Sequence, residues 1–189
     1  RRAGSVYLTG AVDSALTLLR AAVSAYSGTD VAARAQFLVG EALIARGDPA
    51  QAIVEFNRVL SSYFQHKVAA TAQYRVARCL DALGRGVDAT GSYQAVVRGY
   101  PLAPEAPAAA YLAGVGLLRR NLPRAAAPWF QIVLDRYARS DAQGVVAFAR
   151  PEHQELVEAA LCMLEWSWHS AGDMGQVAGA PHLLLKRMP

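Results

Sequence analysis

A two-helix pattern that recurs every 37 residues constrains the fold of this chain more than any other feature. Its clearest copy runs from Ala35 to Tyr63, where Gly-Asp-Pro at 47–49 separates two stretches of apolar residues at helical spacing. A glycine that closes one helix and a proline in the first turn of the next are typical of a helical hairpin. The sequence therefore predicts one helix that ends near residue 46 and a second helix from 49 to 63.

Nine positions keep the 37-residue spacing in three copies, which indicates an internal repeat. One hairpin cannot bury its apolar face alone, so we predict that the copies stack on one another. The turn between the two helices holds Gly47, Gly84 and Asn121. The other eight columns are Phe37, Tyr74 and Tyr111; Gly40, Ala77 and Gly114; Leu43, Leu80 and Leu117; Ala52, Ala89 and Ala126; Phe56, Tyr93 and Phe130; Val59, Val96 and Val133; Leu60, Val97 and Leu134; Tyr63, Tyr100 and Tyr137.

The residue sizes in these columns indicate how the two helices of a hairpin pack. Gly40 of the first helix and Ala52 of the second are small, so the two backbones can approach closely. Phe56, four residues after Ala52, then fills the space between the helices and the next repeat. The sequence thus predicts close helix pairs with an aromatic side chain inserted beside each small residue.

This pattern resembles the tetratricopeptide repeat, with a small residue at its eighth position, Ala at the twentieth and an aromatic residue at the twenty-fourth. Pro101 also fits the proline near the thirty-second position, whereas Phe64 and Ala138 depart from it. The common repeat has about 34 residues. The longer form resembles the envelope variety of Gram-negative bacteria, namely the periplasmic Tol-Pal-associated cell-division coordinator and the lipoprotein of the outer-membrane-protein assembly machine.

The resemblance covers residues 3–140 and, more weakly, the chain to 175. It implies an all-α, right-handed solenoid of about eight to nine helices that binds a partner on its concave face. It also favours a periplasmic or outer-membrane-associated location, with the cytoplasm as the alternative.

We expect one solenoid domain over 1–189, with a partial repeat at 1–28, repeats at 33–69, 70–106 and 107–140, and a divergent repeat with a C-terminal cap at 141–189. Subtracting 37 places Gly10 at a turn, so 11–26 would be a second helix and 1–9 the end of a first helix. The chain would then be an excerpt of a longer array. Fourteen residues interrupt the period after Tyr137, and a short helix is expected over 141–148. A helix over 151–170, a turn at Gly172 and a capping helix over 182–188 follow.

The sequence contains no pattern that predicts catalysis. The four histidines share no motif, and GxSxG, HExxH, Walker A and GxGxxG patterns are missing from it. Cys162, Glu165 and His169 fall on one helix face, but the neighbouring tryptophans favour packing or a contact surface there. Cys79 and Cys162 are interpreted as small buried apolar residues. We therefore predict no enzyme, no metal and no cofactor.

Charge and hydropathy exclude two further classes of partner. The formal net charge is +4, but the basic residues are scattered with no run longer than two. Nucleic-acid binding usually needs a basic stripe, so we predict no nucleic-acid partner. No apolar stretch reaches the length of about 18 residues that a membrane helix needs, so we predict no membrane span.

By resemblance, the second, fifth, ninth and twelfth positions of each repeat line the concave face. Aromatic residues and arginine are common anchors of protein interfaces, although the fifth-position aromatics can instead pack between repeats. The lysine, asparagine and arginine clamp of chaperone-binding relatives is missing from these positions. The tyrosine column at 26, 63, 100 and 137 is expected in the core. The predicted partner-binding residues are Phe37, Glu41, Tyr74, Arg78, Asp81, Tyr111, Val115, Leu118, Trp166 and His169.

The resulting hypothesis is a non-catalytic scaffold that holds a peptide, a helix or a folded protein. Three alternatives stay open. The chain could be a cytoplasmic scaffold in polarity, motility or GTPase coupling, or the recruiting domain of a larger enzyme. It could also self-associate through the ends of the array.

Overall fold

The computed structural model describes residues 2–140, 146–148, 153–173 and 175. It divides into two compact units, residues 1–100 and residues 101–189. Within the described residues no helix is both long and apolar enough to cross a membrane. The predicted all-α class is confirmed, with eight helices in the described ranges. The right-handed winding and the organisation as a single solenoid stay predictions.

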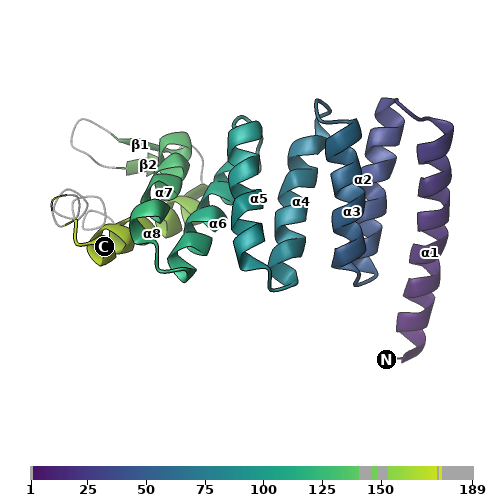
Figure 1. Ribbon diagram of the computed structural model, residues 1–189, viewed down its shortest axis with the longest axis horizontal. Coiled ribbons are helices and arrows are strands. Elements are labelled where there is room, and N and C mark those ends of the chain that lie inside the picture. The colour runs from purple at the N-terminus through teal and green to yellow at the C-terminus, as the bar shows by residue number, and fades with distance from the viewer. Residues whose placement is uncertain (1, 141–145, 149–152, 174, 176–189) are drawn as a thin grey trace. The chain divides into compact units, whose positions relative to one another are not determined.

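The first unit consists of five helices that pack in chain order (Figure 1). Besides its contacts with the next helix, α2 also contacts α4, so the first helices of successive hairpins lie side by side. The sequence-based boundaries of the central hairpin are confirmed to within one residue. The helices are α1 (Arg2–Ala25), α2 (Asp30–Ala45), α3 (Pro49–Ser62), α4 (Val68–Ala82) and α5 (Gly86–Gly99).

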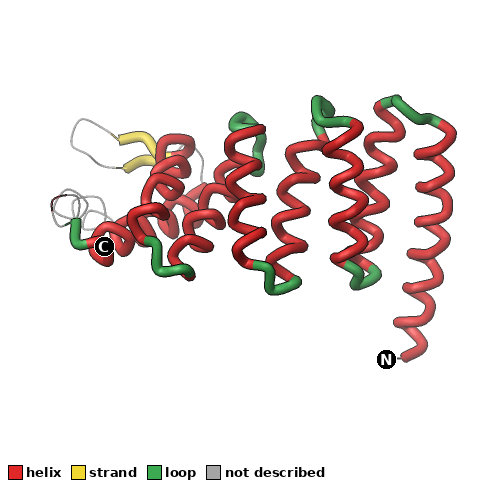
Figure 2. The backbone as a smooth tube through the Cα atoms, viewed as in Figure 1, coloured by secondary structure: helices red, strands yellow, loops and turns green. Residues whose placement is uncertain are grey.

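The second unit contains a further hairpin, a two-stranded sheet and one more helix (Figure 2). Helix α7 packs against both α6 and α8, and α6 also contacts α8. The fourth first-type helix was predicted over 151–170 and is observed as α8, closed by Gly172. The elements are α6 (Ala106–Arg119), α7 (Pro123–Tyr137), β1 (Ala138–Ser140), β2 (Val146–Phe148) and α8 (Gln154–Ala171).

The short helix expected over 141–148 is wrong where the structure describes this segment. Strands β1 and β2 pair antiparallel, with Arg139 opposite Ala147. Valine and phenylalanine at 146 and 148 favour strand over helix, and pairing with β1 provides the backbone hydrogen bonds. Residues 141–145 and the predicted cap over 182–188 lie outside the described residues.

The three residues of the predicted turn column and Gly172 form the same C-terminal cap at the ends of α2, α4, α6 and α8. Gly47, Gly84, Asn121 and Gly172 have φ of 85°, 73°, 55° and 75°. In each cap the amide after the turn residue donates to a carbonyl five residues earlier, as from Asp48 to Leu43 at 2.9 Å and from Asp173 to Trp168 at 3.0 Å. This is the Schellman motif, which requires a left-handed residue and therefore favours Gly or Asn.

The small-residue column explains how closely the helices of a hairpin approach. A Cβ added at Gly40 would lie 2.4 Å from the Phe56 ring, and one at Gly114 would lie 2.6 Å from the Phe130 ring. Both rings are fully buried. The predicted contact between small and aromatic residues is therefore confirmed.

The turn predicted at Gly10 in the N-terminal partial repeat is wrong, whereas the helix predicted after it is observed as part of α1. Gly10 lies inside the single continuous helix α1 and does not form a turn. The three hairpin turns at 47, 84 and 121 have proline or glycine within two residues after the turn residue, whereas Ala11, Val12 and Asp13 follow Gly10. These residues permit helix, and a single glycine costs a helix only about 1 kcal/mol.

Two of the four tyrosines in the column at 26, 63, 100 and 137 form hydrogen bonds to the loop that precedes their own hairpin. The Tyr63 hydroxyl accepts a hydrogen bond from the Gly28 amide at 3.4 Å, and the Tyr100 hydroxyl donates to the Phe64 carbonyl at 3.3 Å. Tyr26, which was expected in the core, is 54% exposed.

Candidate partner-binding surfaces

The predicted partner-binding residues fall on two surfaces, one in each unit. The first-helix face of unit 1 holds Phe37 and Glu41 on α2 and Tyr74, Arg78 and Asp81 on α4. The first-helix face of unit 2 consists of the remaining five residues. These are Tyr111, Val115 and Leu118 on α6, and Trp166 and His169 on α8.

Each ring of the fifth-position aromatic column packs against the second-helix aromatic of its own hairpin. The centroids lie 5.5 to 5.8 Å apart in the three copies, and the rings are tilted or edge-on, as aromatic pairs prefer. All three column residues are partly exposed. They therefore contribute to the hairpin interior and still present surface. The pairs are Phe37 with Phe56, Tyr74 with Tyr93, and Tyr111 with Phe130.

Glu41 forms an ion pair that sequence reasoning missed. Its Oε1 lies 2.9 Å from Arg75 Nε and so connects α2 to α4. Arg75 lies 34 positions after Glu41, and the packing of α2 against α4 brings these two positions together. The missed signal is a pair of opposite charges nearly one repeat apart.

The remaining charged residues of this face, Arg78 and Asp81, contact tyrosines of the hairpin that α4 and α5 form. The buried Tyr93 donates its hydroxyl to Asp81 Oδ2 at 2.9 Å. Burial, the hydrogen bond to Asp81 and the negative charge of this carboxylate raise the pKa of Tyr93. The neighbouring Tyr74 raises the pKa of the Arg78 guanidinium. Arg78 is exposed, so a cation lies beside an aromatic side chain on this face.

The first-helix face of unit 2 is less charged and more exposed on α8. Trp166 is 52% exposed and His169 is exposed, whereas the three α6 residues are partly buried. Cys162 is exposed beside them, so the expectation that both cysteines are buried is wrong for this residue. Cys79 is buried, and burial raises the pKa of its thiol. Within the described ranges no group of three His, Cys, Asp or Glu could hold a metal ion.

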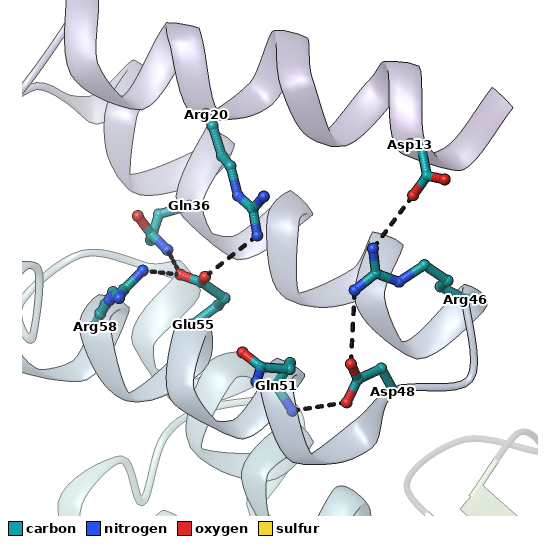
Figure 3. Close-up of polar contacts among 8 residues, drawn as sticks. All are labelled: Asp13, Arg20, Gln36, Arg46, Asp48, Gln51, Glu55 and Arg58. Carbon is teal, nitrogen blue, oxygen red and sulfur yellow. Dashed lines mark hydrogen bonds and ion pairs between the residues drawn. The ribbon is translucent and has the colours of Figure 1, made fainter. Parts of the chain in front are cut away.

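A buried carboxylate joins the first three helices, and it was not found from the sequence (Figure 3). Glu55 on α3 is 4% exposed. It accepts hydrogen bonds from Gln36 Nε2 at 2.5 Å and Arg58 Nη1 at 2.7 Å, and Arg20 Nη2 of α1 lies 3.9 Å away. Because its partners come from three helices, this cluster is a joint of unit 1.

The loop after α3 also connects two hairpins through a contact between a histidine and a carboxylate. His66 Nε2 contacts Asp30 at the start of α2, while its Nδ1 accepts the Val68 amide at 3.2 Å. Arg34 forms a second ion pair with Asp30 at 2.9 Å. The hydrogen bond from His66 is the main reason that the pKa of Asp30 is lowered.

A pocket of about 500 Å³ lies between α7 and α8 of unit 2. Its apolar wall includes Pro128 and Trp168. Arg124 on its rim donates to the Ala171 carbonyl at 3.2 Å and lies 3.7 Å from Asp173. The positive and negative groups at the rim are therefore already paired with each other. The pocket thus shows no preference for one sign of ligand charge.

Stacked two-helix hairpins with left-handed turn residues and a small residue under each inserted ring define a helical-repeat protein. The sequence profile of the tetratricopeptide repeat matches residues 8–63 and 46–104. These ranges together cover 97 of the 189 residues. The chain therefore belongs to the tetratricopeptide repeat family. Members of this class act as protein-interaction scaffolds, so protein partners are implied.

Solved structures show the same fold. A tetratricopeptide repeat protein from Parabacteroides merdae ATCC 43184 matches with a TM-score of 0.62 and 17% identity, covering 90% of this chain and 58% of that chain. MamA 41-end from Desulfovibrio magneticus RS-1 matches with a TM-score of 0.57 and 20% identity, covering 90% and 82%. A MamA RS-1 double mutant matches with a TM-score of 0.59 and 20% identity, covering 89% and 80%. No curated protein matches in sequence.

Proposed function

We propose that this protein is a non-catalytic scaffold that binds a peptide, a helix or a folded partner on its first-helix faces. The observation that carries the proposal is the combination of partly exposed aromatic rings with an exposed arginine on α4. Tyr74 and Arg78 lie together there, and Asp81 is held by the buried Tyr93. Aromatic residues and arginine supply most of the strong contacts in protein interfaces, and rigid placement lowers the entropy lost on binding.

A matched pair of arginine variants tests this proposal. Random dodecapeptides displayed on phage are selected against the full chain, and the affinities of the selected peptides are measured by fluorescence anisotropy. Because interface arginines commonly contribute 1–2 kcal/mol, we expect Arg78→Ala to weaken those that bind unit 1 by about tenfold. Arg85→Ala removes another exposed arginine, at the α4–α5 turn, and is expected to change little.

Two results would argue against this scaffold function. The first is a selection that yields no specific binder. The second is an equal loss of affinity with both arginine variants, which would indicate a non-specific effect of charge. Circular dichroism of both variants is expected to match the wild type because both side chains are exposed.

We further propose a bacterial cell-envelope setting for the complete protein, on the resemblance of its 37-residue repeat to two envelope proteins. A leader or lipid-attachment signal upstream of Arg1 in the gene would support this setting, and an uninterrupted cytoplasmic protein would contradict it. Fusion to catalytic sequence would instead favour the recruiting-domain alternative. Mass that rises with concentration in light scattering would favour self-association.

A further inference from the structure

The fourth first-type helix departs from the repeat at the position that matters most for hairpin packing. Glu165 lies seven residues before the turn residue Gly172, as Gly40 lies before Gly47 and Gly114 before Asn121. At the two glycines, even a methyl group would lie within 2.6 Å of the inserted ring. A glutamate cannot occupy such a contact, so α8 has a different surface chemistry at this point.

The carboxylate of Glu165 has an unmet requirement for a partner. Its Oε1 is buried, and no described residue forms a hydrogen bond with that atom. Burial raises the pKa of this carboxyl group. Removing a carboxylate oxygen from water without a hydrogen-bond donor costs free energy, and a charged donor would offset this cost. A cation with N–H donors would therefore be a favourable partner for this carboxylate.

The surroundings of Glu165 favour the same kind of group. Helix α8 contains three glutamates and no lysine or arginine. The next residue, Trp166, leaves about half of its surface exposed, and the face of an indole ring attracts ammonium and guanidinium groups. His169 is exposed one turn further along α8. The charge and the ring together are complementary to a lysine or arginine side chain.

Among the described residues of unit 2, Arg124 is already engaged elsewhere. It contacts Asp173 and the Ala171 carbonyl on the flank of α8 that faces α7.

We propose that the Glu165–Trp166 edge of α8 receives a lysine or arginine side chain of the protein partner. This inference rests on the proposed scaffold function and specifies the chemistry of its unit 2 surface. The carboxylate would accept the N–H donors, and the indole would cover the apolar stem of the partner's side chain. The partner is thus a segment with a basic residue beside an apolar one.

The selection with random dodecapeptides tests this inference directly. We expect one class of the selected peptides to bind unit 2. In this class, arginine or lysine next to an apolar residue should be enriched. Glu165→Gln keeps the shape of the side chain and removes its charge, and should lower the affinity of this class by about tenfold. Trp166→Ala should lower it by a few-fold. Glu155→Gln, which removes an exposed charge from the same helix, should change it by less than about twofold.

The possible failures separate the two proposals. Binders that lack basic residues, or an equal loss of affinity with Glu155→Gln and Glu165→Gln, would overturn the inference while leaving the scaffold function in place. A library that yields no binder would overturn both. Circular dichroism of the Glu165→Gln variant excludes unfolding as the cause of a lost affinity.

Discussion

The substitution of Gly40 by alanine gives the sharpest test of how these hairpins pack. The new Cβ would lie 2.4, 2.6 and 2.8 Å from three atoms of the Phe56 ring. This ring is fully buried, so its displacement would disturb the core around it. Overpacking of this kind typically costs about 1–3 kcal/mol, and three contacts below 3.0 Å place this case at about 2–3 kcal/mol.

The same substitution also has a favourable term, which a second glycine measures separately. Alanine is better than glycine in a helix by about 1 kcal/mol, so Gly40→Ala should destabilise the protein by a net value of about 1–2 kcal/mol. Gly91 lies in helix α5 with open space around it. Gly91→Ala should therefore stabilise the protein by up to about 1 kcal/mol.

Urea unfolding followed by far-UV circular dichroism gives both free energies of unfolding. Tryptophan fluorescence is unsuitable because all three tryptophans lie after residue 128, outside unit 1. The two variants should change stability in opposite directions. If Gly40→Ala stabilises the protein as much as Gly91→Ala does, the small residue is not required by the Phe56 ring, and the packing argument is wrong.

Three further predictions concern other contacts. Glu55→Ala leaves two hydrogen-bond donors without their acceptor and should lower the free energy of unfolding by about 2–3 kcal/mol; a loss below about 0.5 kcal/mol would show that solvent replaces the cluster. The pKa of Asp30 is lowered in the folded state by His66, so its contribution should be present above the ordinary pKa of 3.8 and disappear as the pH falls through the lower folded value. The difference in Tm between wild type and Asp30→Asn should shrink accordingly below pH 4, and a constant difference would contradict the assignment. In a thiol-reactivity assay with a disulfide reagent, Cys162 should react quickly and Cys79 slowly, because only Cys162 is exposed; equal rates would contradict the described burial.

The local rules of the repeat were sufficient to predict the hairpins. The turn at Gly47, the helix that begins at Pro49 and the contact of Gly40 with Phe56 each depend on residues close together in sequence. Steric limits on the left-handed turn and on a ring above a glycine act over a few ångströms, so a three-fold repetition of residue size reveals them. For the same reason the fourth turn at Gly172 could be found despite the inserted residues.

Only the tertiary structure decided the features that depend on side chains far apart in sequence. Glu55 meets Arg20 and Gln36 from two other helices, and Glu41 of α2 meets Arg75 of α4. The repeated residue columns predict how closely the helices pack. The conformation of each long polar side chain, however, depends on which hydrogen-bond partner lies nearest once the helices have packed. Strand pairing after α7 also required a partner segment. The period along the chain therefore determines the hairpin, whereas the charges and exposed rings available to a partner are determined by how neighbouring helices meet.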